Sequence, residues 1–286
     1  MYYLLIIVAV LMFGGSFALN DEYRKLRSSS FVSSMENSFL GGIAGLIVLL
    51  FVSGFQFQAT AFTLCMAACA SLCGMGFAFC SFKALDKVNL SLYSLFSMLG
   101  GMALPFFQGI VFYNEKLTTA KVICFVLISI ALILTVSKDK SKKGAVFYVG
   151  VFMFNGLAGM LSKIFVSATF EKTSTEWYAI WTAIFTIVIA GVVRFGVLRK
   201  KAMPQYTWKA LSISSMNGVL NRVANFLLVV ALAHVDTSVQ YPMVTGGVII
   251  VSTLVCYLGK NKPKKKEVFS VVLSFAGLLI LFLIQN

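Results

Sequence analysis

Apolar and basic residues alternate along this chain, and this pattern constrains the fold more than any other feature of the sequence. About ten apolar segments are each close to the ~20 residues that a helix needs to cross ~30 Å of hydrocarbon. Nineteen of the 24 Lys and Arg residues fall in every second gap between them or at the edges of that gap. We therefore expect an all-α integral membrane protein with ten transmembrane helices, at 2–20, 31–53, 59–82, 89–113, 118–137, 145–169, 176–197, 208–232, 237–258 and 267–284.

The composition excludes a separate water-soluble domain. Hydrophobic residues make up 59% of the chain and charged residues only 12%, too few to cover the surface of a soluble protein of this length. The net charge of +14 does not indicate nucleic-acid binding, because the basic residues flank membrane segments, where they contact lipid head groups and fix topology. We expect membrane lipids as partners and no nucleic acid.

The chain divides into two halves of five segments, 1–139 and 140–286, that share short stretches of similar sequence. The stretch 10–15, VLMFGG, has a counterpart in 151–156, VFMFNG. An odd number of helices per half inverts the second half, and the charges agree, because equivalent gaps carry opposite bias. The gap after the second segment lacks Lys and Arg, whereas the gap after the seventh and its edges hold five of them, Arg194, Arg199, Lys200, Lys201 and Lys209. We expect two inverted five-helix repeats around a central cavity, an arrangement typical of secondary transporters.

Basic loops are retained in the cytoplasm, so the charge bias also predicts an orientation. It places the basic gaps inside and both termini outside, in a multi-pass protein of the bacterial inner (plasma) membrane. The segment 2–20 has no basic residues before it and no cleavage site, and it is expected to remain as a permanent helix.

Two short stretches carry a family resemblance. Ala84–Val88, and a fourth segment that ends at Tyr113–Leu117, resemble the drug/metabolite transporter superfamily, EamA-like group. The resemblance implies ten helices in two repeats, a central cavity, alternating access and small organic substrates. Glu115 matches the acidic residue that follows the fourth helix in that family, whereas the second half has no carboxylate at 257–260. Many members of the family have cytoplasmic termini, in contrast to the charge pattern of this chain.

Helix-breaking residues recur at corresponding places in the two halves. Pro and Gly within a membrane helix expose backbone groups, which find partners where they line a cavity. We interpret these clusters as paired kinks around a transport path, although Pro and Gly are also simply tolerated in membrane helices. They are Gly100, Gly101 and Pro105 in the fourth segment, and Pro242, Gly246 and Gly247 in the ninth.

The eighth segment carries the densest polar pattern. Asn217, Asn221 and Asn225 recur every four residues and form one stripe, with Arg222 beside it. A cation near the middle of a membrane is costly, so Arg222 should face water, a carboxylate or an anionic substrate group. Three alternatives remain open: an ion pair with Glu36, binding of a substrate carboxylate or phosphate, and extension of the side chain to an interface.

Other polar and aromatic residues in the segments complete the candidate site. A carboxylate beside a cation in low dielectric can exchange protons, so Glu36 is the candidate for proton coupling. The remaining candidates for substrate binding are Asn155, Lys163, Trp181 and Tyr241.

These features predict a secondary transporter for a small polar or amphipathic metabolite, such as an amino acid or organic anion, with no cofactor and no metal. A monomer is sufficient for this function. The chain has no phosphate-binding loop, which excludes ATP-driven pumping by this chain alone, and its acidic residues and single His are too scattered for an enzyme site. The alternatives are a flippase for a lipid-linked anionic head group and a non-transporting membrane scaffold.

Overall fold

The computed structural model describes residues 1–27, 30–85, 90–135, 145–198, 207–258 and 265–284. Within these ranges the chain is all-α, with ten α-helices and one short π-helix. Their bounds are α1 Tyr2–Arg27, α2 Phe31–Val52, α3 Ala61–Leu85, α4 Leu90–Phe112, α5 Thr119–Thr135, α6 Ala145–Ser167, α7 Thr175–Gly191, η1 Val192–Val197, α8 Trp208–Leu232, α9 Thr237–Leu258 and α10 Lys265–Leu283.

Helix boundaries follow packing and capping as well as hydropathy. The first helix continues to Arg27 rather than ending at residue 20, because Tyr23 is buried and packs against Ala210 and Ile213 of α8. The predicted single helix at 176–197 changes at Gly191 into the π-helix η1. The hydroxyls of Ser30 and Thr207 accept backbone N–H groups three residues on, and so cap the starts of α2 and α8.

The chain is a multi-pass integral membrane protein. Among the described residues, six helices are long and apolar enough to cross a membrane, namely α1, α2, α3, α6, α8 and α7 continued into η1. The other four, α4, α5, α9 and α10, have shorter apolar stretches by the same measure. Large apolar side chains such as Ile47, Phe107 and Phe275 are at least half exposed, as expected where a surface meets acyl chains rather than water.

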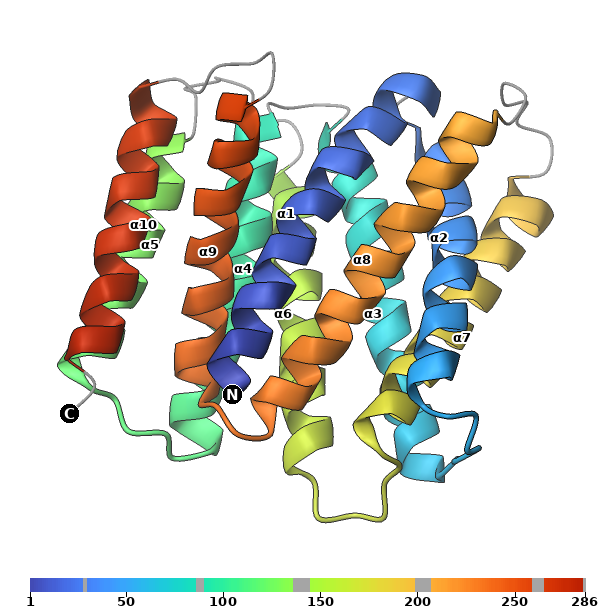
Figure 1. Cartoon of the computed structure of the whole chain (residues 1–286), viewed down its shortest axis with the longest axis horizontal. Coiled ribbons are helices and arrows are strands. Elements are labelled where there is room, and N and C mark those ends of the chain that lie inside the picture. The colour runs from blue at the N-terminus through green and yellow to red at the C-terminus, as the bar shows by residue number, and fades with distance from the viewer. Residues whose placement is uncertain (28–29, 86–89, 136–144, 199–206, 259–264, 285–286) are drawn as a thin grey trace.

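The helices run up and down in one bundle (Figure 1). In this view α5 and α10 form one edge and α2 and α7 the other, with α1 and α8 crossing in front. The start of α1 and the end of α10 lie at the same end of the bundle, whereas Arg24, Lys25 and Arg27 lie at the opposite end. We call the end with Arg24, Lys25 and Arg27 the basic end. The end with the start of α1 and the end of α10 is the terminal end.

The contacts between helices repeat in the two halves of the chain. This is seen by taking α6 to α10 as the equivalents of α1 to α5, in the same order. The pairs α1–α8 and α6–α3 correspond, as do α2–α8 with α7–α3 and α4–α6 with α9–α1. Three further contacts, α2–α7, α4–α9 and α5–α10, each join a helix to its own equivalent in the other half. Each half therefore packs mainly against the other half rather than within itself.

Glycine permits the closest of these contacts. A Cβ atom at Gly218 would lie 2.0 Å from the backbone oxygen of Gly41, so α2 and α8 touch backbone to backbone. A Cβ atom at Gly100 would similarly lie 2.2 Å from the backbone oxygen of Phe152, which brings α4 onto α6. Small residues allow such close approach in membrane helices, where packing rather than water exclusion drives association.

Candidate functional site

Two amide side chains are exposed near the middle of α8. Asn221 and Asn225 lie one turn apart on the same face, and both are exposed. The Nδ2 group of Asn225 donates to the backbone oxygen of Asn221 at 2.8 Å and to its Oδ1 at 3.1 Å. The two side chains thus form a polar patch about halfway along a membrane-spanning helix, and we call them the amide pair.

The face that carries the amide pair points into the bundle. One turn further along α8, Leu228 packs with residues of α1 and α9, and Val229 packs with Phe165 of α6 and Tyr178 of α7. On the opposite face, Met216 is 55% exposed, as expected beside lipid. The amide pair is therefore an exposed polar surface on the inward-facing side of α8.

Arg222 follows Asn221 in α8 and has no ion-pair partner among the described residues. Its aliphatic stem covers Gly45 of α2, where an added Cβ would meet Arg222 Cγ at 2.6 Å. The side chain lies deep among protein atoms yet is not fully buried. Within the described part of the chain, its guanidinium makes no hydrogen bond or ion pair. The site therefore combines two amides with an uncompensated cation.

The proposed pair between Arg222 and Glu36 is wrong. Gly45 lies beside Arg222, and Glu36 precedes Gly45 by nine residues, about 13 Å along the helix axis at ~1.5 Å per residue. Glu36 instead accepts from Arg27 Nη2 at 2.6 Å and from Arg194 Nε at 2.7 Å. Protonation of Glu36 would leave two guanidinium groups side by side, and its role in proton coupling stays a prediction.

The third asparagine of the stripe is not part of this exposed surface. Asn217 is buried, and its Oδ1 accepts a hydrogen bond of 2.5 Å from Ser16 on α1. Four-residue spacing drifts around a helix by about 40° per step, so the first residue of the stripe turns into the contact with α1. The stripe therefore divides into one structural asparagine and the amide pair.

Three other candidates serve as ties between helices. Asn155 Nδ2 donates to the backbone oxygen of Ser97 at 2.7 Å, joining α6 to α4. The Tyr241 hydroxyl donates to the backbone oxygen of Gly159 at 3.0 Å, joining α9 to α6. Trp181 Nε1 donates to the backbone oxygen of Gln58 at 3.0 Å and holds the turn before α3. Each of the three side chains therefore makes a hydrogen bond to the backbone of another segment.

The helix-breaking residues also lie in helix contacts. Gly100 and Gly101 adjoin Phe152 and Asn155 of α6, and Pro105 adjoins Gly159. In α9, which contains Pro242, Gly247 adjoins Val10 of α1, and Gly246 adjoins Ile128 of α5 and Leu278 of α10. The clusters therefore explain how α4 approaches α6 and how α9 approaches α1, and their role as kinks in a transport path stays a prediction.

Lys163 lies in a polar cluster at the terminal end of the bundle. Its Nζ is 3.4 Å from Glu115 Oε1 and 5.2 Å from the centre of the Tyr113 ring. The Glu115 carboxylate accepts the backbone N–H groups of Thr237 and Ser238 at 2.7 and 2.8 Å, and also the Ser238 hydroxyl. Glu115 therefore binds the positive start of α9. Lys163 forms an ion pair with Glu115 and is not an unpaired cation near mid-membrane.

Two further polar contacts lie near this cluster at the terminal end. Lys121, buried in α5, pairs with Asp236 before α9 at 2.7 Å, and Gln240 Nε2 donates to the backbone oxygen of Leu228 at 2.9 Å. Sequence reasoning singled out Glu115 through the family resemblance but missed its partners. The signal was available, because Asp236-Thr237-Ser238 is a typical helix start that offers free N–H groups to an anion.

Comparison with known proteins places the fold. One crystal structure matches 99% of this chain and 96% of its own chain, with a TM-score of 0.80 and 15% sequence identity. At this identity the likeness establishes the fold and not the function. No family model matches the chain, and no curated protein sequence matches it.

Proposed function

We propose that the protein is a secondary transporter that moves a small polar or amphipathic metabolite by alternating access. The observation that carries this proposal is the exposed amide pair on the inner face of α8, beside an arginine with no ion-pair partner among the described residues. Polar surface at this depth of a membrane protein is costly unless water or a ligand reaches it. We infer from this that a hollow lies beside the amide pair, which a non-transporting scaffold would not need.

Two features of the fold support this proposal. The matched helix contacts are those expected of two inverted repeats, residues 1–139 and 140–286, and such repeats are the usual frame for alternating access. The terminal end is tied by Glu115, Lys121 and Gln240. By the charge rule the terminal end faces outside, and we infer from these ties a conformation closed to the exterior.

The substrate should carry a carboxylate or another anionic group together with hydrogen-bonding groups. Arg222 offers a forked cation for the anion, and each asparagine amide can both donate and accept. Amino acids and related organic acids fit this description. The sequence resemblance to drug/metabolite transporters of the EamA-like group is consistent with substrates of this size.

The test is counterflow in liposomes that contain the purified protein, across a panel of amino acids, organic acids and amines. A compound that exchanges in the parent should lose its flux in Arg222→Ala, because the anion loses its counter-charge. Lys209→Ala is the matched control: it removes a cation from the same helix, but one that is 63% exposed and paired with Glu22. Unchanged flux in Arg222→Ala would remove Arg222 from the site.

The same liposomes distinguish the alternatives. Labelled lipid that crosses the bilayer without any solute counterflow would favour the flippase. No flux of solute or lipid, and no thermal stabilisation by any compound of the panel, would favour a scaffold and overturn the proposal. Binding stabilises the folded form by RT ln(1 + [L]/Kd), so the thermal measurement reports a ligand even without transport.

A further inference from the structure

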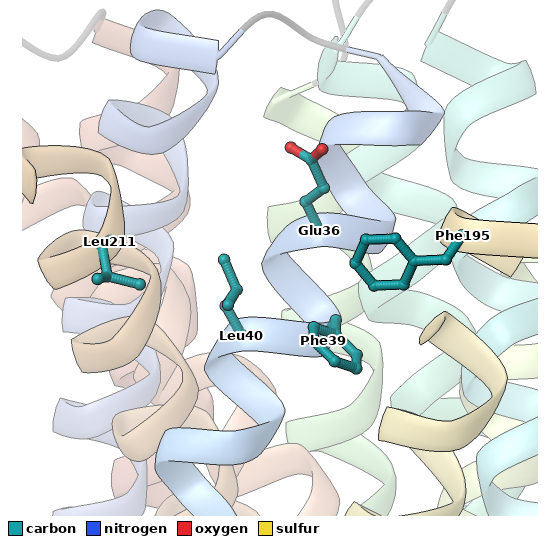
Figure 2. Close-up of a pocket in the computed structure, with 5 residues that line it drawn as sticks. All are labelled: Glu36, Phe39, Leu40, Phe195 and Leu211. Atoms are coloured by element: carbon teal, nitrogen blue, oxygen red, sulfur yellow. The ribbon is translucent and has the colours of Figure 1, made fainter. Parts of the chain in front are cut away.

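A cavity lies at the basic end, away from the amide pair. It has a volume of about 320 Å³ and is lined by Glu36, Phe39 and Leu40 of α2, Phe195 of η1 and Leu211 of α8. Figure 2 shows Leu211 on one side of α2 and Phe195 on the other, with the Glu36 carboxylate above the apolar side chains. Four of the five lining residues are apolar, so the cavity suits hydrocarbon rather than a small polar solute.

The cavity has a cationic rim. Glu36 is shared between Arg27 and Arg194, and this group of three carries a net charge of +1. Arg27 is buried, whereas 14% of the Arg194 side chain is exposed. Arg194 uses its Nε to reach Glu36, and its guanidinium lies 5.5 Å from the centre of the Phe195 ring. Its terminal N–H groups remain for a further acceptor, directly beside the apolar cavity.

Other basic residues lie at the same end of the bundle. The last turn of α1 carries Arg24 and Lys25, whereas Lys209, in the first turn of α8, is paired with Glu22. The wall formed by η1 is a π-helix, a local irregularity often found at functional sites. An anionic group on an acyl chain meets both requirements, because its chain fits the cavity and its head fits the rim.

We propose that this cavity holds one acyl chain of an anionic phospholipid, with the lipid phosphate bound by Arg194. The lipid would bridge α2, η1 and α8 on the surface of the bundle. The phosphate would compensate the net charge of the Glu36 group, and Phe39 and Phe195, whose rings meet edge to face at 5.4 Å, would together form one apolar wall beside the chain. This site does not depend on transport by the central hollow.

The test is native mass spectrometry of the purified full-length protein with phosphatidylglycerol and phosphatidylcholine of identical acyl chains. We expect phosphatidylglycerol to be retained several-fold more than phosphatidylcholine. Arg194→Gln should abolish that preference, and Arg194→Lys should restore part of it. Leu211→Trp, which fills the cavity, should lower retention of both lipids, whereas Leu279→Trp, on the exposed surface of α10, should retain lipid like the parent.

Two results would overturn the proposal. Equal retention in the parent, Arg194→Gln and Leu211→Trp would mean that the bound lipid is unspecific annular lipid. Equal binding of glycerol phosphate, which lacks acyl chains, would mean that the rim binds free anions and the cavity is irrelevant. Should Leu211→Trp not fold, Phe195→Ala removes one wall at a 57% exposed position and should weaken retention in the same way.

Discussion

Glu115 and Glu36 are both buried carboxylates, but they hold opposite ends of the bundle in different ways. Glu115 binds the backbone N–H groups at the start of α9 and pairs with Lys163, so it ties three elements at the terminal end. Glu36 holds two guanidinium groups, one from α1 and one from η1, beside an apolar cavity. The first carboxylate is satisfied by fixed backbone, whereas the second depends on mobile side chains, so we expect the terminal end to be the more rigid.

The largest expected effect that tests this comparison is that of Glu115→Ala. It leaves Lys163 and two helix N–H groups without their acceptor, and removing one member of a buried ion pair costs about 3–5 kcal/mol. The measurement is the denaturation temperature in detergent. A variant as stable as the parent would show that Glu115 does not hold the terminal end.

The next largest effect is expected for Glu36→Gln. The amide keeps one hydrogen-bond acceptor but loses the charge, and hydrogen bonds to charged groups contribute about 1.5–3 kcal/mol. Arg194 keeps its contact with the Phe195 ring and is partly exposed to solvent, which limits the loss of stability. If Glu36→Gln destabilised the protein more than Glu115→Ala under the same conditions, the order of rigidity proposed for the two ends would be reversed.

A pH titration tests Glu115 without changing the fold. Burial alone would raise the pKa of this loop carboxyl, but hydrogen bonds from Ser238 and Thr237 outweigh it and lower the pKa below its ordinary value of 4.5. Its contribution is therefore complete above pH 4.5 and is lost as pH falls from 4.5 through the lower folded value. The difference in denaturation temperature between the parent and Glu115→Gln should shrink below pH 4.5, and a constant difference would contradict the assignment.

The smallest effect is expected for Glu22→Gln, which serves as a reference for both ends. Glu22 pairs with Lys209 at 2.9 Å, and the two side chains are 49% and 63% exposed. Exposed ion pairs contribute about 0.2–1 kcal/mol because water and salt screen them. A change in denaturation temperature comparable to that of Glu36→Gln would show that exposure does not distinguish these pairs.

Hydropathy predicted the helices well but could not predict how side chains pair. Membrane burial imposes an apolar composition, so the ten segments of the sequence correspond to the ten helices. It does not mark where a helix stops, because Tyr23 extends α1 through contacts with α8 that lie almost 190 residues away in the chain. The change to a π-helix after Gly191 also has no signal in composition.

The candidate site was predicted in part for the same reason. Spacing identified the polar face of α8, and two of its three asparagines are exposed on the inward-facing side of that helix. Spacing could not show that Ser16 satisfies Asn217, or that Glu36 reaches Arg194 across 158 positions of sequence. Partners of this kind are decided by three-dimensional packing, so charged residues that look uncompensated along the sequence can be paired in the fold.

The contact between Gly41 and Gly218 has a consequence for any change of shape. No side chain separates the two backbones, so α2 and α8 have almost no room to slide past each other or to separate. Gly45, beneath the Arg222 stem, extends this close contact, which we call the seam, by another turn. The two helices should travel as one piece although they come from different halves of the chain. A moving body in this protein would then be a composite of both halves, and its hinges should be sought in the turns around that seam rather than near residue 140.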